Sequence, residues 1–467
     1  MSKKSKAKMD FSDGIYDARV LGYPKMTLLG IQHMFAMFGA TVLVPALTGL
    51  SVSATLMFAG LGTLLFHFLT KGKVPAFLGS SFAFIGGYAA VTQIGITDGG
   101  DAIHDYSLLP YACAGVACAG LVYLILAGLI KFFGAKKVMR FFPPIVTGPI
   151  IIAIGLTLSS SAINNSATNW LVAITAIVIV IACNIWGKGM IKIIPIMLGV
   201  LGSSLLAVVL HFTGLMQTLD PLKLEALKEA AWVGLPFKMH DTVFGLLAGD
   251  FDPAFLLTSI ITIMPIALAT MIEHIGDISA ISSTCKRNYI ADPGLHRTLL
   301  GDGLATTLAS LFGAPANTTY GENTGVLSLS KVFDPKVIRI AAVFAIFVSF
   351  SPKFAALVSL MPTATIGGVS LVLYGMISAV GVRNVVENKV DFEKSRNVII
   401  AAIILVLSIG INYAGAIQIP VGSITISFSG LAVGALVGII LNAILPGKDY
   451  EFTDGMGTGD QSVSFKV

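Results

Sequence analysis

The chain has 467 residues, of which 55% are hydrophobic and 12% are charged, with a formal net charge of +5 and a mean hydropathy of +0.86. This composition excludes an ordinary soluble domain. Apolar runs of about 17 to 25 residues, long enough to cross a bilayer, recur along the chain. We therefore expect an all-α polytopic membrane protein embedded in a lipid bilayer.

Fourteen apolar segments are predicted to cross the membrane: 27–49, 53–70, 76–96, 108–132, 143–163, 169–186, 191–213, 255–281, 298–313, 316–330, 338–351, 354–380, 398–416 and 422–445. Two of them, 76–96 and 316–330, are interrupted by glycine and hydroxyl residues and predict broken helices. The predicted division is a tail (1–26), seven segments (27–213), a loop (214–254), seven more segments (255–445) and a second tail (446–467).

The basic residues alternate with these segments. With the N-terminus placed in the cytoplasm, the inside connections carry 26 of the 30 lysines and arginines. This follows the positive-inside rule, so the charge indicates a cell-membrane protein with both termini in the cytoplasm. It does not indicate a nucleic-acid partner. The outside loop 214–252 contains "LDPLKLEALKEAAWVGLP", whose spacing predicts a short amphipathic helix at the surface.

Enzymatic and metal chemistry are not expected. The four cysteines show no CxxC spacing, which argues against a disulfide framework and against a metal site. The sequence has no nucleotide-binding glycine loop and no nucleophile and base at catalytic spacing. We therefore predict no cofactor and no catalytic residues.

The two broken segments hold the third position in each set of seven. Seven crossings end on the opposite side of the membrane from where they began, so the next seven run in the opposite orientation. An internal repeat here would therefore be inverted. "AFLGSSFAF" around Phe82 and "PANTTYGEN" around Tyr320 each place hydroxyl residues before an aromatic ring. Paired breaks of this kind indicate a substrate site at the membrane midplane, where a ligand satisfies the freed backbone groups. The alternative is that small residues only allow close helix packing: Gly79, Ser80, Ser81 and Gly321.

Four carboxylates fall within predicted segments, where a charge is costly: Glu273, Asp277, Asp302 and Glu322. Glu273 and Asp277 are four residues apart and share one helix face. Two acids this close in a low dielectric do not both ionise easily, so the pair is predicted to bind a proton.

Each of these acids has an alternative role. A hydrogen bond to a neighbouring helix would also explain Glu273 and Asp277, and it is the preferred explanation for Asp302. His274 points away from the acidic face and is expected to pack against other helices. Thr41 is a polar residue in an apolar segment, and an interhelical hydrogen bond explains it as well as a function does.

Glu322 lies at the second break, beside Tyr320 and Gly321. A carboxylate accepts hydrogen bonds from N–H donors, and exposed backbone amides donate to carbonyls. Phe82, at the first break, offers a ring for stacking. Together these groups predict a neutral, flat ligand with alternating N–H and C=O groups. No Arg or Lys lies within either break, so an anion would lack its usual partner.

The chain resembles the nucleobase-ascorbate transporter family, also called nucleobase cation symporter 2, and in particular its bacterial uracil-transporting members. The resemblance runs through "QHMFAMFGATVLVP", "KGKVPAFLGSSFAF", "DPGLHR", "NTTYGEN" and "GGVSLVLYG". The family signature is Gln or Glu, Asn, any residue, Gly, four of any residue, Thr, and a basic residue or Gly. It is matched by Glu322, Asn323, Gly325 and Lys331, with Ser330 in place of the usual Thr.

The resemblance implies two inverted repeats of seven segments, a core domain (segments 1–4 and 8–11) and a gate domain (segments 5–7 and 12–14), with short antiparallel strands in segments 3 and 10. It implies that Glu273 and Glu322 bind the base and that Phe82 stacks on it. Backbone groups near Phe82 and Gly321 would add hydrogen bonds, with Tyr320 beside them. It also implies a homodimer formed through the gate domains.

We therefore expect a proton-coupled symporter that imports uracil by alternating access, with the proton on Glu273 and Asp277. Uracil-transporting members often have His at the position of Asp277, whereas several purine-transporting relatives have an acid there. A symporter for xanthine or guanine is thus one alternative. An anion transporter of the same architecture is the alternative from a different class.

Overall fold

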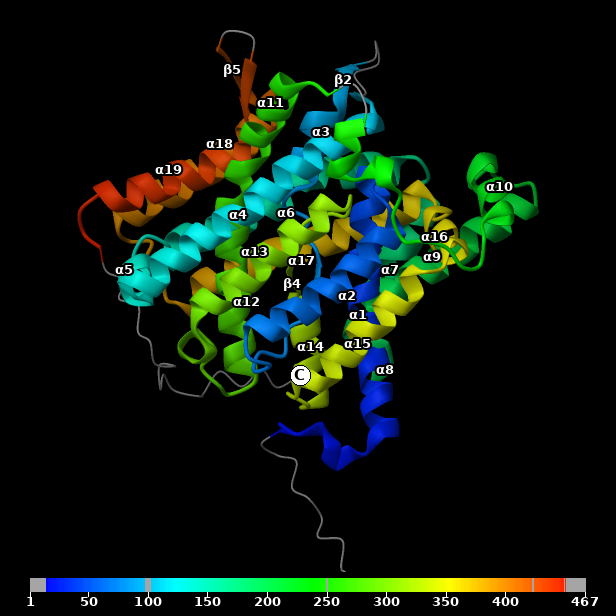
Figure 1. The fold of residues 1–467 in the computed structure, drawn as a ribbon, viewed down its shortest axis with the longest axis horizontal. Helices are drawn as coiled ribbons and strands as arrows, with labels where there is room; N and C mark the ends of the chain where they lie inside the picture. Colours follow the sequence, from blue (N-terminus) through cyan, green and yellow to red (C-terminus); the bar gives the residue numbers. More distant parts are fainter. Residues whose placement is uncertain (1–13, 97–101, 249–250, 422–423, 449, 451–467) are drawn as a thin grey trace, which may run out of the picture.

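Helices make up most of the computed structural model, which describes residues 14–96, 102–248, 251–421, 424–448 and 450 (Figure 1). The elements of the first half are α1 (Tyr23–Thr48), α2 (Val52–Leu69), β1 (Leu78–Ser80), α3 (Ile85–Thr92), β2 (Gln93–Ile96), β3 (Ala102–His104), α4 (Leu109–Phe133), α5 (Ala135–Met139), α6 (Pro144–Ala167), α7 (Trp170–Trp186), α8 (Met190–Ile193) and α9 (Pro195–Phe212).

The second half follows a loop that contains α10 (Pro221–Glu229). Its elements are α11 (Pro253–Ile263), α12 (Ala267–Thr284), α13 (Leu295–Leu311), β4 (Asn317–Thr319), α14 (Gly321–Ser330), α15 (Pro335–Ser349), α16 (Pro352–Ser359), α17 (Thr363–Glu387), α18 (Ser395–Ala414), β5 (Ile417–Val421), β6 (Ile424–Phe428) and α19 (Gly430–Ile444).

Local sequence explains where these helices begin and end. Pro24 stands in the first turn of α1, where its missing N–H costs nothing. The same helix ends at Gly49, whose φ of 80° is the left-handed conformation that glycine adopts readily. Asp220 accepts a hydrogen bond from the Leu222 amide at 2.9 Å and so caps α10. The helix predicted in the outside loop is therefore confirmed.

Eight helices of the described part are long and apolar enough to cross a membrane, or nine if α15 and α16 form one bent span. The helices α7 and α19 are apolar but shorter. Each of the fourteen predicted segments contains at least one helix. Several helices fall short of these limits of length and composition, so the count of fourteen spans stays a prediction.

The predicted segment 354–380 begins too early. The short helix α16 occupies its first residues and is bent by 90° from α15, and α17 starts only at Thr363. Pro352 and Pro362 cause these boundaries, because a proline lacks the N–H that would continue a helix and restricts the residue before it. Segment 191–213 likewise divides at Pro195 into α8 and α9.

Two strand pairs were not predicted. The strands β2 and β3 form one antiparallel hairpin, and β5 and β6 form another. The second hairpin replaces the start of the helix that was predicted over 422–445, and α19 begins only at Gly430. Its sequence "ITISF" alternates apolar and hydroxyl residues, which is the period of a strand.

The packing of the helices repeats between the two halves. The helix α4 of the first half lies along α13 of the second, and α15 of the second half lies along α2 of the first (Figure 1). Similarly, α7 packs on α9 as α18 packs on α19, and α7 contacts α17 as α18 contacts α6. Each pair of contacts is related by a shift of seven positions in the predicted segment order. This is the packing that an internal repeat would produce.

The helices also fall into two packing groups. One contains α1 to α4 and α11 to α15, and the other contains α6 to α9 and α17 to α19. Most helix contacts between the groups are made by α1, which meets α9 and α17, and by α12, which meets α6 and α19. These two helices therefore lie at the boundary between the groups.

The two interrupted segments meet each other. The strands β1 and β4 pair antiparallel, with Leu78 opposite Thr319, and the helices α3 and α14 begin just after them. Hydroxyl groups of the flanking helices complete the pairing: Thr63 accepts from the Leu78 amide at 2.9 Å, and Thr306 donates to the Asn317 carbonyl at 2.7 Å. The predicted breaks and the short antiparallel strands are confirmed.

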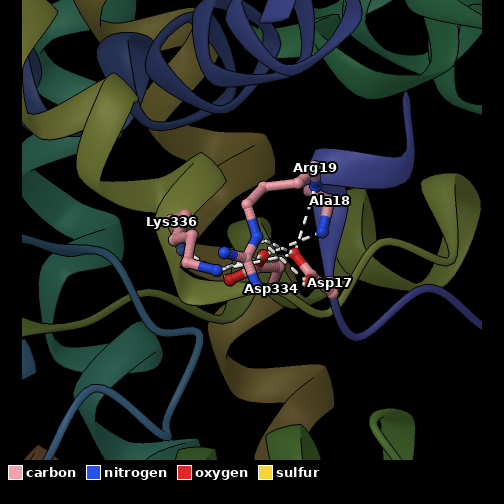
Figure 2. A network of polar contacts seen from close by, with 5 residues as sticks. All are labelled: Asp17, Ala18, Arg19, Asp334 and Lys336. Carbon is pink, nitrogen blue, oxygen red and sulfur yellow. Dashed lines mark hydrogen bonds and ion pairs between the residues drawn. The ribbon is translucent and has the colours of Figure 1, made fainter. Parts of the chain in front are cut away.

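The segment before α1 is held in place by polar contacts (Figure 2). Ile15 forms a parallel bridge with Val332, and the Ala18 amide donates to Asp334 at 2.8 Å. The Arg19 guanidinium donates to Asp17 and holds the pKa of that carboxyl well below its usual range. Part of the predicted tail 1–26 is therefore fixed against the connection between α14 and α15, and α1 begins within that range.

Gly79 generates a testable prediction about the strand crossing. A Cβ at this position would lie 2.5 Å from the Tyr320 ring and 2.7 Å from the Thr41 hydroxyl. We expect Gly79→Ala to lower stability by about 1–3 kcal/mol through overpacking, measured as a lower midpoint of thermal unfolding in detergent.

Gly86→Ala in α3 is the matched control, because no atom lies within 4 Å of its added Cβ. Alanine favours a helix over glycine, so this variant should unfold at the same temperature or slightly above it. Equal midpoints for the two variants would show that the crossing is not tightly packed around Gly79.

Candidate functional site

The crossing of β1 and β4 gathers most of the predicted site residues. Phe82 follows β1, and its side chain is 7% exposed. Its ring meets that of Tyr374 in α17 edge-on, with centroids 5.8 Å apart and an angle of 75° between the planes. Because Tyr374 belongs to the other packing group, this contact crosses the boundary between the two groups.

Tyr320 holds the two breaks and α1 together. Its hydroxyl donates to the Ser80 carbonyl at 2.9 Å and accepts from the Thr41 hydroxyl at 3.3 Å. The Ser80 hydroxyl in turn donates to the Thr41 carbonyl at 3.0 Å. The sequence predicts Tyr320 beside the ligand, but no sequence signal shows that its hydroxyl joins the two breaks. For Thr41, the interhelical alternative describes what the structure shows.

Asp277, a residue of α12, lies beside the start of α14. Its Oδ2 accepts a hydrogen bond from the Thr319 hydroxyl at 2.8 Å, and a Cβ added to Gly321 would lie 3.8 Å from its Oδ1. The first turn of a helix has free backbone N–H groups and a positive dipole end, both of which favour a carboxylate. Glu273 and Asp277 both belong to the continuous helix α12, so they share one face as predicted.

Asp302, a second acid, is buried next to His274. The His274 Nδ1 and the Asp302 Oδ2 are 3.1 Å apart, and both side chains are 0% exposed. The Thr319 hydroxyl is also 3.5 Å from the His274 Nδ1. A continuous chain of polar contacts therefore leads from Asp277 through Thr319 to His274 and Asp302. The contact with a neighbouring helix that the sequence favours for Asp302 is confirmed, whereas His274, expected only to pack, is its partner.

Glu322 is the second residue of α14, and its side chain lies outside the described part of the structure. Its role in binding stays a prediction. Around it, several buried side-chain atoms have hydrogen-bonding capacity that the described residues leave unused; they belong to Ser81, Thr318, Asn323 and Thr324. Buried polar groups normally have partners, so these atoms mark the breaks as a place for a polar ligand. Asn323 was visible in sequence only through its place in the signature.

The described residues hold no cluster of three or more His, Cys, Asp or Glu side chains that could bind a metal ion. One cavity, of about 480 Å³, lies elsewhere and is lined by residues that include Ser107, Tyr111, His240 and Phe255. None of its lining residues belongs to β1, β4 or the starts of α3 and α14. The crossing is therefore the better candidate of the two, because it combines broken helices, acids and an aromatic ring.

Comparison with known proteins identifies the family of this chain. Residues 24–417 match the sequence model of a protein family that is described as "Permease family". The uracil permease of Bacillus subtilis (strain 168) is 39% identical over 437 residues, which cover 91% of this chain and 93% of that protein. The uracil permease of Bacillus caldolyticus is 39% identical over 431 residues, which cover 90% of this chain and 92% of that protein.

Among solved structures, the transmembrane domain of a cyanobacterium bicarbonate transporter, BicA, matches with a TM-score of 0.51 and 13% identity, over 92% of this chain and 98% of that one. At this identity the likeness extends to the fold alone. The family match and the permease relatives agree with the signature around Glu322. The chain belongs to the permease family, which is the nucleobase-ascorbate transporter family that its motifs resemble, and it is a multi-pass membrane transporter rather than an enzyme.

Proposed function

We propose that this protein is a proton-coupled symporter that imports uracil across the plasma membrane. The observation that carries the proposal is the antiparallel crossing of β1 and β4, which brings Phe82, Asp277 and the first turns of α3 and α14 to one place. The names of its relatives support uracil as the substrate, because two uracil permeases are 39% identical to this chain over nearly its whole length.

Uracil suits the chemistry of this site. It is a neutral, flat ring with two N–H donors and two carbonyl acceptors. In the proposed complex the ring stacks on Phe82, Glu273 and Glu322 accept its N–H groups, and backbone amides near Phe82 and Gly321 donate to its carbonyls. Tyr320 contributes by holding the two breaks at the spacing that the base requires.

The proton is proposed to bind the Glu273 and Asp277 pair. Protonation from outside neutralises a negative charge of the site, and base binding then favours the same state of the protein. Asp277 is the better-placed partner, because its contact with Thr319 ties it to β4. The buried His274 and Asp302 continue this polar chain into the core domain. Release of the proton inside then weakens the hold on the base.

Transport is proposed to follow alternating access. The core domain would consist of segments 1–4 and 8–11, the gate domain of segments 5–7 and 12–14, and the repeats of 27–213 and 255–445 would be inverted. The matching helix contacts of the two halves support this arrangement, and α1 and α12 would form the sliding surface. We further propose a homodimer through the gate domains, with loop 214–254 outside and the tails 1–26 and 446–467 in the cytoplasm.

The first prediction concerns Glu322. Wild-type protein in liposomes should take up labelled uracil, and an inward proton gradient should stimulate this uptake. Glu322→Gln should reduce uptake at least about tenfold, because losing a charge-assisted hydrogen bond costs roughly 1.5–3 kcal/mol. Glu225→Gln in the exposed helix α10 is the control and should transport normally.

Substrate choice is tested in the same experiment. Uptake of xanthine without uptake of uracil would show that the substrate is a purine, and it would implicate Asp277 in that choice. If neither base is transported by the wild type, the proposed function is wrong.

A substitution of Asp277 tests proton coupling separately from base binding. Asp277→Asn keeps an acceptor for the Thr319 hydroxyl but can no longer change charge. We expect this variant to exchange labelled for unlabelled uracil across the membrane at near the wild-type rate. Its gradient-driven accumulation should fall at least about tenfold, because protonation no longer favours the bound state. A gradient response equal to that of the wild type would remove Asp277 from the proton site.

A further inference from the structure

The connection between α4 and α6 is unusually basic. The sequence "KFFGAKKVMRFF", residues 131–142, covers the end of α4 and most of this connection, and it contains four basic residues and no acid. The side chains of Lys131, Lys136, Lys137 and Arg140 are all exposed. We refer to residues 131–142 as the basic connector. It includes the short helix α5 and joins one packing group of helices to the other.

The charges of the basic connector have no acidic partner among the described residues, whereas other basic residues of the chain do. Lys73 pairs with Asp292, and Arg383 pairs with Glu387 at 2.6 Å. More positive charge lies nearby. The pKa of His296 is lowered mainly by burial and further by the charges of Arg297, Lys131 and Lys71. These residues add to the positive charge around the basic connector, whose own four basic side chains have no acidic partner in the described part.

The basic connector also exposes aromatic rings. Phe132 is 83% exposed, and Phe133 and Phe141 are exposed as well. They continue a stripe of exposed apolar residues along α4 with helical spacing: Leu121, Ile125 and Leu129. In a membrane transporter such a stripe faces the hydrocarbon of the bilayer. Because Lys131 and α5 follow directly, the basic connector lies where the hydrocarbon ends and the headgroups begin.

We propose that the basic connector binds the headgroup of an anionic phospholipid in the leaflet that surrounds this end of α4. The phosphate would lie among Lys131, Lys136 and Lys137, while Phe132 and Phe133 insert beside the acyl chains. The occupant is a lipid rather than a soluble anion, because the basic side chains are continuous with the lipid-facing stripe. The positive-inside rule accounts for charge on this side, but it does not require unpaired charges beside exposed aromatic rings.

Such a lipid would act on a connection that is already anchored. The Asn442 side chain of α19 donates to the Arg140 carbonyl at 3.1 Å, and Arg396 donates to the Asn442 side-chain oxygen at 2.7 Å. A bound headgroup would therefore bridge the end of α4 and the group that contains α19. This makes the lipid a candidate to restrain movement between the two packing groups.

Lipid retention by the purified full-length chain tests the proposal directly. The protein in detergent is mixed with phosphatidylglycerol or with phosphatidylcholine of the same acyl chains, and bound lipids are counted by native mass spectrometry. The test variant is K131Q/K136Q/K137Q. The control variant is K188Q/K192Q/K389Q, which removes the same charge from other connections. A milder double variant, K136Q/K137Q, serves if the triple variant does not fold.

We expect the wild type and the control to retain phosphatidylglycerol in preference to phosphatidylcholine. The test variant should lose at least about tenfold in retention, since each basic side chain near an anionic surface contributes about fivefold. Equal retention of both lipids by the wild type, or an equal loss in the test and control variants, would overturn the proposal. So would complete displacement of phosphatidylglycerol by free glycerol phosphate, because the site would then be one for a soluble anion.

Discussion

The structure depends on a constraint that the bilayer imposes on its two broken segments. Backbone N–H and C=O groups that leave a helix inside hydrocarbon need other partners, and here each break supplies partners for the other. The strands β1 and β4 pair over three residues, and hydroxyl groups of Thr63 and Thr306 complete the pairing. Tyr320 can reach the Ser80 carbonyl only because Gly79 has no side chain. Two segments about 240 residues apart thus become one unit.

This unit determines where charge can be held within the membrane. Asp277 in α12 lies beside the start of α14 and accepts a hydrogen bond from Thr319, so the strand crossing determines its position. The buried His274 contacts the same hydroxyl and also contacts the buried Asp302. Intramembrane acids are costly, and the contacts of Asp277 and, through His274, of Asp302 converge on one hydroxyl of β4. That arrangement suits a binding site which opens alternately to each side better than it suits a channel.

Much of this was predictable from sequence, because hydrophobic periodicity and the interruptions in it are local signals. The features that such local signals predicted correctly are the two breaks, the helix α10 and the shared face of Glu273 and Asp277. The start of segment 354–380 was wrong because prolines divide a stretch that is apolar throughout. The two hairpins were missed because short strands and helix ends have similar hydropathy. The contacts of Thr319 with Asp277 and His274 join different elements, and no local pattern encodes them.

We propose that the base binds between the two breaks, and its position can be measured directly. Crystals of the protein grown with 5-bromouracil would locate the bromine by its anomalous scattering. The account predicts one strong peak beside the Phe82 ring, next to the first turn of α14. A strong peak elsewhere, for example in the cavity lined by Tyr111 and His240, would contradict it. In that case the crossing would be a structural element and the site would have to be sought at that cavity.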